Sequence, residues 1–224
     1  MSGSARDAIL SRIRHANGAR PRDEARQRVV DERLTEAPKG VIPARGQLNT
    51  EGRIALFRQM AEKASATVAA VGSYAEVPSA VAFWLRQNNF PTTLKMSADP
   101  RLAAADFGAT ALTVLSGASN GDDLNALSHA DAGIAETGTL MLTSGPENPT
   151  SLNFLPENHI VVLAAKDIEG DMERCWEKLR DRHGKGVMPR SVNFVTGPSR
   201  SADIEQTLLL GAHGPRALHI ILVG

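Results

Sequence analysis

The sequence has a single cysteine, Cys175, among its 224 residues, and this scarcity excludes several classes of protein. One thiol cannot form an intramolecular disulfide, and it cannot supply the thiolates that an iron–sulfur cluster or an all-cysteine zinc site needs. No apolar run approaches the ~20 residues that span a bilayer. The polar start of the chain lacks the hydrophobic stretch of a signal peptide. We therefore expect a soluble, cytoplasmic protein that needs a partner for any electron transfer.

Motifs for nucleotides and metals are missing as well. The sequence contains no HExxH, no Cys/His cluster, no GxGxxG and no P-loop pattern, so we expect no cofactor and no metal in this chain. The formal net charge is zero, but residues 1–60 contain 12 Lys and Arg against 7 Asp and Glu. Such a segment can bind nucleic acid. It has no aromatic residue before Phe57 and no nucleic-acid motif, so a solvated helical arm that pairs with another subunit or protein is the preferred interpretation.

Hydrophobic spacing divides the chain into an arm and a body. Residues 1–48 form a basic arm with two expected helices (4–17 and 22–37) and a linker, and residues 49–224 form the body. Within the body, strands are expected at 66–71, 92–96, 109–115, 134–135, 139–143, 160–164, 191–196 and 217–223, and helices at 77–88, 167–182 and 201–210. This alternation predicts an α/β fold with a mainly parallel open sheet and helices on both faces. Ligand sites in such sheets lie beyond the C-terminal ends of strands.

The segment VTGPSRSADIE (195–205) is the first candidate site. A strand runs into a Gly-Pro turn and then into the helix expected at 201–210, whose first amides would bind an anion together with Arg200. The acidic residues of the segment favour a structural alternative, because they can cap the helix and complement its dipole. The candidate ligand-binding residues are Gly197, Pro198, Ser199, Arg200, Ser201 and Asp203.

A carboxylate follows the strand expected at 134–135. Glu136, in a turn with Thr137, Gly138 and Thr139, is a candidate base or nucleophile if it is buried, and the three residues after it are candidate ligand contacts. The alternative is that Glu136 accepts backbone amides and closes the turn.

His213, between glycines in GAHGP, is the second catalytic candidate, because its ordinary pKa lies near neutrality. It can equally cap a helix C-terminus. His159 is more typical of a structural histidine, and small hydroxyl residues at 143–151 give only a weak ligand signal.

These segments together resemble the LUD-domain family. The resemblance rests on GIAETGT (133–139), PENHI (156–160), NFVTGPSRSADIE (193–205) and GAHGP (211–215), with LHIILV near residue 220. It is dense over residues 130–224, looser over 50–130 and thin in the arm. It implies a fold similar to the NagB, ribose-5-phosphate isomerase and CoA-transferase group.

The resemblance also implies a function. It implies membership in a bacterial lactate utilization system that oxidises L-lactate to pyruvate, in which partner proteins hold the iron–sulfur clusters. This chain would then bind a small carboxylate or a phosphate-containing ligand. One alternative is an acyl- or CoA-transferase-like enzyme, because the nucleophilic glutamate of type I CoA transferases lies in a comparable turn, although the Asn of their Glu-Asn-Gly is missing here. The other is a non-catalytic assembly or regulatory module. A homodimer is expected only as the commonest assembly.

Overall fold

The protein has an α/β fold built on a parallel sheet, which confirms the predicted class. The computed structural model describes residues 4–18, 23–204 and 207–224, and for residues 201–204 and 207–210 it describes the backbone only. The strands of the main sheet are β1 (Thr67–Val71), β2 (Thr93–Met96), β3 (Thr113–Ser116), β4 (Asn125–His129), β7 (Asn158–Ala164) and β12 (Ala217–Val223). They lie in the order β1-β12-β7-β4-β2-β3, and every pairing is parallel.

Two smaller sheets complete the β-structure. The first has the order β8-β5-β6-β9 and contains β5 (Ala132–Ile134), β6 (Thr139–Thr143), β8 (Ile168–Glu169) and β9 (Val192–Val195). Its β5–β8 pairing is parallel, and its other two pairings are antiparallel. The second is an antiparallel hairpin of β10 (Arg200–Ile204) and β11 (Thr207–Leu210).

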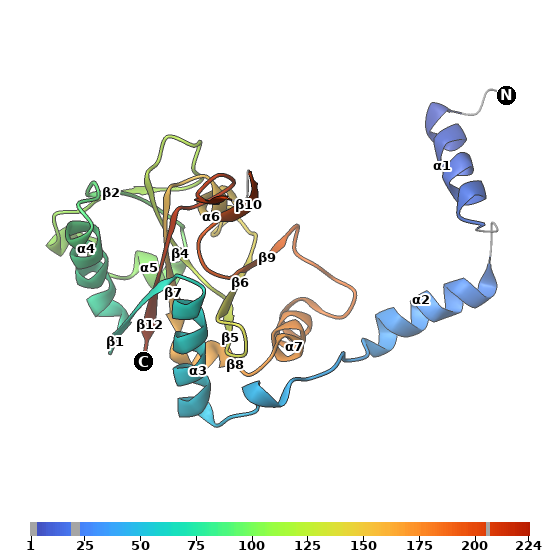
Figure 1. Ribbon diagram of the computed structural model, residues 1–224, viewed down its shortest axis with the longest axis horizontal. Coiled ribbons are helices and arrows are strands. Elements are labelled where there is room, and N and C mark those ends of the chain that lie inside the picture. The colour runs from blue at the N-terminus through green and yellow to red at the C-terminus, as the bar shows by residue number, and fades with distance from the viewer. Residues whose placement is uncertain (1–3, 19–22, 205–206) are drawn as a thin grey trace.

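The helices differ in how many of their residues are buried. They are α1 (Ala5–Ala16), α2 (Glu24–Glu36), α3 (Thr50–Lys63), α4 (Val77–Gln87), α5 (Pro100–Ala103), α6 (Ser151–Phe154) and α7 (Met172–His183). Helices α1 and α2 bury no residue and extend away from the body (Figure 1). Among the described residues, no helix combines the length and apolar character needed to cross a bilayer.

The central strands β7 and β12 are buried on both faces, as expected for strands inside a parallel sheet. Their side chains alternate between two cores because the strand repeat is two residues. Val161 and Leu163 pack with α3, whereas Ile160 and Val162 pack with α4. Each face of the sheet is therefore covered, and the two cores share the same strands.

One predicted element is wrong. The helix expected at 201–210 is instead the β10–β11 hairpin, in which Arg200 pairs with Leu210 and Ser201 with Leu209. The apolar run at 207–210 is short, and periodicity does not separate helix from strand in such a run. Strand β4 was missed, and α7 begins at Met172 rather than at residue 167, because Ile168 pairs with Gly133 in β8.

Three buried histidines lie on neighbouring strands of the main sheet: His129 on β4, His159 on β7 and His219 on β12. Burial lowers their pKa values to about 4, about 3 and about 4, so all three are neutral at pH 7. His129 Nε2 lies 2.8 Å from Tyr74 Oη, and His219 Nδ1 lies 2.7 Å from Thr67 Oγ1.

We expect the free energy of unfolding to fall as the pH is lowered from 6.5 to 4. Histidines in the unfolded chain have pKa values near ~6.5, so in this window the unfolded state binds protons that the folded state does not. Urea titrations at several pH values test this, and His219→Gln should have a shallower dependence than the wild type. A free energy of unfolding that stays constant from pH 7 to 4.5 would contradict the prediction.

We expect Leu163→Ala to lower the free energy of unfolding by about 2–5 kcal/mol, because it leaves a cavity between the sheet and α3. Leu163 is fully buried, whereas Leu34 on α2 is 58% exposed. Leu34→Ala is therefore the matched control and should change stability by less than about 0.5 kcal/mol. Equal effects of the two substitutions, measured by denaturant unfolding, would disprove the assigned core.

Candidate functional site

Five of the eleven candidate site residues that the sequence singled out meet in one cavity of about 290 Å³. We call it the amino-edge cavity, because it lies where β7 and β12 begin. It is lined by Asn153, Phe154, His159, residues 194–200, residues 213–215 and Leu218. Gly197, Pro198, Ser199, Arg200 and His213 are thus brought together as candidate site residues. The cavity is at the opposite edge of the sheet from the C-terminal strand ends where the sequence analysis placed it.

Hydrogen bonds fix the two loops of this cavity to each other and to α3. Ser199 N donates to Pro215 O at 2.8 Å, and the Ser199 carbonyl accepts from Gly211 N at 3.0 Å. Gly197 has a φ of +71°, and a Cβ there would lie 2.1 Å from the Ala64 carbonyl oxygen. Only glycine allows this close approach to the end of α3.

Arg200 has a different position from the one predicted. Its Nη2 donates to Ala64 O and, at 2.6 Å, to Ser65 Oγ, so it caps the C-terminus of α3. Because β10 replaces the start of the expected helix, the described residues of this segment offer no helix-start amides to an anion. Arg200 nonetheless lines the cavity, and a guanidinium has five N–H donors in all. The side chains of Ser201 and Asp203 lie outside the described residues.

Two buried polar side chains of residues that line the amino-edge cavity have hydrogen-bonding atoms without a partner among the described residues. Asn153 is 1% exposed, and neither its amide nitrogen nor its amide oxygen makes a hydrogen bond. His159 is completely buried; its Nε2 lies 2.7 Å from Ser128 Oγ, and its Nδ1 has no partner. The sequence analysis found no signal at Asn153 and interpreted His159 as structural.

The described wall of the amino-edge cavity contains a positive charge and no negative charge. Arg200 is a permanent cation in its wall, and the exposed His213 also lines it. None of the described residues that line the cavity is an aspartate or a glutamate. The cavity can therefore hold a small anion without repulsion from its own wall.

Glu136 lies away from this cavity. It is 6% exposed in the turn between β5 and β6, where its Oε1 accepts from Met172 N at 3.3 Å and its Oε2 lies 4.0 Å from Arg45 Nε. It does not line the amino-edge cavity, so Glu136 and His213 do not share a site. The contact with the first amide of α7 matches the structural alternative, in which Glu136 accepts backbone amides.

The residues after Glu136 are also engaged within the protein. Thr137 and Thr139 are linked through their hydroxyl oxygens at 2.7 Å, and Thr139 is linked in the same way to Thr196 at 2.7 Å. Gly138 has a φ of +66°, and a Cβ there would lie 2.2 Å from Ala61 N on α3. Thr196 is the member of this chain of contacts that reaches the amino-edge cavity.

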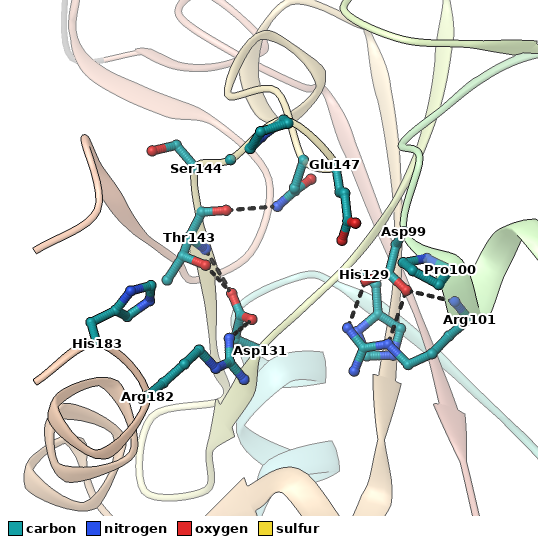
Figure 2. Close-up of a pocket in the computed structure, with 13 residues that line it drawn as sticks. Asp99, Pro100, Arg101, His129, Asp131, Thr143, Ser144, Glu147, Arg182 and His183 are labelled. Carbon is teal, nitrogen blue, oxygen red and sulfur yellow. Dashed lines mark hydrogen bonds and ion pairs between the residues drawn. The ribbon is translucent and has the colours of Figure 1, made fainter.

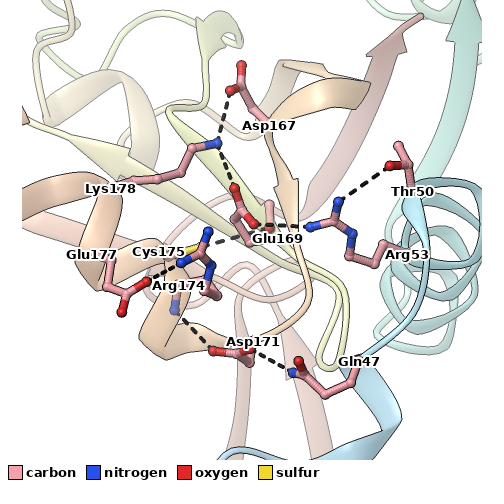
Figure 3. Close-up of polar contacts among 11 residues, drawn as sticks. Gln47, Thr50, Arg53, Asp167, Glu169, Asp171, Arg174, Cys175, Glu177 and Lys178 are labelled. Carbon is pink, nitrogen blue, oxygen red and sulfur yellow. Dashed lines mark hydrogen bonds and ion pairs between the residues drawn. The ribbon is translucent and has the colours of Figure 1, made fainter. Parts of the chain in front are cut away.

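A polar cluster joins the arm, α3 and α7 close to Cys175 (Figure 3). Arg53 on α3 donates to Glu169 at 3.1 Å, and Gln47 donates to Asp171, the N-cap of α7, at 2.8 Å. Burial raises the pKa of Cys175 to about 12, with a smaller contribution from Glu169. The thiol is therefore protonated and buried, which agrees with a structural role.

A second cavity, of about 520 Å³, lies where β2 and β4 end (Figure 2). We call it the carboxyl-edge cavity; it is lined by residues 99–101, His129, Asp131, residues 143–148 and residues 182–183. The sequence analysis assigned no role to His129 and found only a weak signal in the 143–151 loop.

Most charged side chains that line the carboxyl-edge cavity form ion pairs with one another. Asp99 accepts from Nε of Arg101 at 2.9 Å and from its Nη2 at 2.6 Å. Burial raises the pKa of Asp99, but these bonds outweigh it and hold the pKa below its ordinary value. Asp131 pairs with Arg182 and accepts from Thr143 N at 2.8 Å. This cavity thus combines three carboxylates, including Glu147, with two guanidinium groups.

No group of three or more His, Cys, Asp or Glu side chains in the described part of the chain is placed to hold a metal ion. The prediction that this chain has no cofactor of its own stays a prediction.

Known proteins resemble this chain mainly in its second half. Residues 125–223 match the family model of the LUD domain. Lactate utilization protein C of Oceanobacillus iheyensis is 37% identical over 98 residues, covering 43% of this chain and 42% of that protein. Lactate utilization protein C of a Geobacillus species is also 37% identical over 98 residues, covering 43% of this chain and 41% of that protein. The chain thus matches about two fifths of the length of these relatives.

A solved structure supports the fold. The crystal structure of a DUF162 family protein from Deinococcus radiodurans superposes with a TM-score of 0.57 at 22% identity, covering 79% of this chain and 99% of that one. At this identity the likeness shows the fold alone. The region that matches the LUD-domain model, residues 125–223, contains β4, β7 and β12 and all four segments on which the predicted resemblance rests. Residues 125–223 of this chain therefore resemble the LUD domain, as the loop motifs indicated.

Proposed function

We propose that this protein is a component of a bacterial L-lactate utilization system and that it binds a small carboxylate in the amino-edge cavity. The observation that supports this most directly is the convergence of the loops at 197–200 and 213–215 on one cavity. These loops belong to the segments that resemble the LUD-domain family. Arg200 and His213 provide the donors for an anion, and no described carboxylate in the wall opposes it.

The size of the cavity favours a small metabolite. Its volume of about 290 Å³ is at the lower limit of ligand pockets, which range over about 300–1,000 Å³. A molecule of a few heavy atoms fits this volume better than a dinucleotide or coenzyme A does. The relatives named Lactate utilization protein C support lactate or its product pyruvate as that metabolite.

Oxidation of L-lactate to pyruvate releases two electrons and two protons, and these electrons need an acceptor. We propose that iron–sulfur proteins of the same system accept them, since the single thiol of this chain is buried and protonated. In this proposal the chain binds and orients the carboxylate, and its partners perform the electron transfer.

A CoA-transferase-like activity has less support. It requires Glu136 to be open to an acyl-CoA, whereas Glu136 is buried against Met172 and Arg45. A role in assembly has one specific observation in its favour. Helices α1 and α2 bury no residue but expose apolar side chains such as Ile9 and Leu34, which a partner protein could cover.

We expect L-lactate or pyruvate, at 100 times its dissociation constant, to stabilise the protein by about 2.7 kcal/mol, a shift of several degrees in Tm. Phosphate and coenzyme A should give smaller shifts. His213→Ala should abolish the shift, because His213 is exposed in the cavity wall and its loss leaves the core intact.

His183→Ala is the matched control, since His183 lines the carboxyl-edge cavity instead. It should retain the full shift in Tm. If no carboxylate in the panel stabilises the wild type, or if His213→Ala responds like the wild type, the proposed site is wrong.

A further inference from the structure

We propose that the carboxyl-edge cavity is a second ligand site, separate from the amino-edge cavity, and that it binds a free amino acid through its ammonium and carboxylate groups. The inference does not rest on the proposed function, which concerns the other edge of the main sheet. Its basis is the place of the cavity in the sheet topology, the two ion pairs that line it, and the carboxylate of Glu147.

The cavity lies where the connections of the main sheet change direction. Strands β2 and β4 are adjacent and parallel. From the carboxyl end of β2 the chain continues to β3 on one side, whereas from the carboxyl end of β4 it returns to the main sheet as β7 on the other side. Open α/β sheets bind their ligands in the crevice that such a divergence opens. Residues 99–101 follow β2, His129 ends β4 and Asp131 follows it, so the cavity occupies this crevice.

The size and lining of the carboxyl-edge cavity suit a polar metabolite. Its volume of about 520 Å³ lies within the range of ligand pockets, about 300–1,000 Å³. Such pockets are usually lined by large apolar side chains. Here the apolar residues of the described lining are only Pro100, Gly145 and Pro146. The remaining lining residues are charged or can form hydrogen bonds, so a ligand with several polar groups fits best.

Two guanidinium groups offer a binding surface to a carboxylate. The side chains of Arg101 and Arg182 are 42% and 53% exposed, whereas those of their partners Asp99 and Asp131 are each 12% exposed. Each aspartate thus holds its arginine from the protein side and leaves the cation toward solvent. Asp99 engages only Nε and Nη2 of Arg101, and a guanidinium has five N–H donors in all. Such a planar group binds carboxylates in a bidentate manner.

Glu147 supplies the opposite charge. It is exposed, and it forms no ion pair with any residue that the structure describes. Figure 2 shows its carboxylate pointing into the space between the Asp99–Arg101 pair and Asp131. An ammonium group has three donors and a positive charge, so it is a matching partner for this carboxylate.

The two signs of charge together specify the class of ligand. A simple anion would be attracted by the guanidinium groups and repelled by Glu147, and a simple amine would meet the reverse. An amino acid carries an ammonium and a carboxylate on one carbon atom. It can therefore bind Glu147 and a guanidinium at the same time, while the two ion pairs of the wall stay intact.

Thermal shift measurements with the twenty standard L-amino acids test this inference. At least one of them, at saturating concentration, should raise the Tm of the wild type by several degrees. Glu147→Gln keeps the shape of the side chain and removes its charge. It should weaken the binding of that amino acid about tenfold or more in isothermal titration calorimetry, the effect of losing a hydrogen bond between charged groups.

Glu157→Gln is the matched control, since Glu157 is also exposed but directly precedes β7 at the opposite edge of the sheet. It should leave the affinity for the amino acid unchanged. Both substitutions are at exposed positions, so both variants should fold like the wild type.

Analogues of the amino acid separate its two contacts on the wild type alone. For L-serine these are 3-hydroxypropanoate, which lacks the ammonium, and ethanolamine, which lacks the carboxylate. Each should bind the wild type about tenfold or more weakly than the amino acid does. In Glu147→Gln the amino acid and its analogue without the ammonium should bind alike, because the contact that distinguishes them is gone.

The outcomes are distinguishable. If no amino acid raises the Tm, or if Glu147→Gln binds the amino acid as tightly as the wild type does, the inference is wrong. If instead His213→Ala abolishes the binding, amino acids enter the amino-edge cavity, which also overturns the inference. The response to L-lactate should be equal in Glu147→Gln and the wild type, so failure of this inference leaves the proposed function standing.

Discussion

The parallel pairing of β12 with β7 organises this molecule. The two strands pair along their full length, from Ala217 with Asn158 to Val223 with Ala164, and side chains from both faces enter separate cores. β12 also pairs with β1, and β7 also pairs with β4, so the main sheet cannot form without β7 and β12. The two cavities lie at opposite ends of this central region, and their walls depend on its register. A slip of one residue would exchange the two cores and move His159 out of the amino-edge cavity.

Much of the fold was predictable because its helices and strands have clear periodicity. The limits of β12 match the expectation at 217–223, and α4 ends one residue before the predicted boundary at 88. Prediction failed where pairing partners, rather than local pattern, decide the structure. The run at 207–210 becomes a strand because Arg200 and Ser201 lie opposite it, a relation that the local sequence does not contain.

The candidate site was predictable where local sequence marks a loop, and not where distant strands decide its position. Glycines at 197 and 214 mark loops of special geometry, and these loops do meet at one cavity. Their edge of the sheet was not predictable, since β9 belongs to the small sheet and pairs with β6 rather than with β7. The sequence analysis did not single out Asn153, because it is notable only for a buried amide without a hydrogen-bond partner. That property depends on residues far along the chain.

The position of β12 has a consequence for how the protein acquires its structure. Thr67 in β1 contacts His219 in β12 across 152 positions, and Ser128 contacts His159 across 31. Contacts between distant positions require large loops to close before any packing compensates for the lost chain entropy. Proteins dominated by such contacts fold slowly, in milliseconds to seconds. Helices α3 and α4 can form early from local interactions, whereas the amino-edge cavity exists only after β12 has inserted between β1 and β7. The amino-edge cavity should therefore be among the last features to form during refolding.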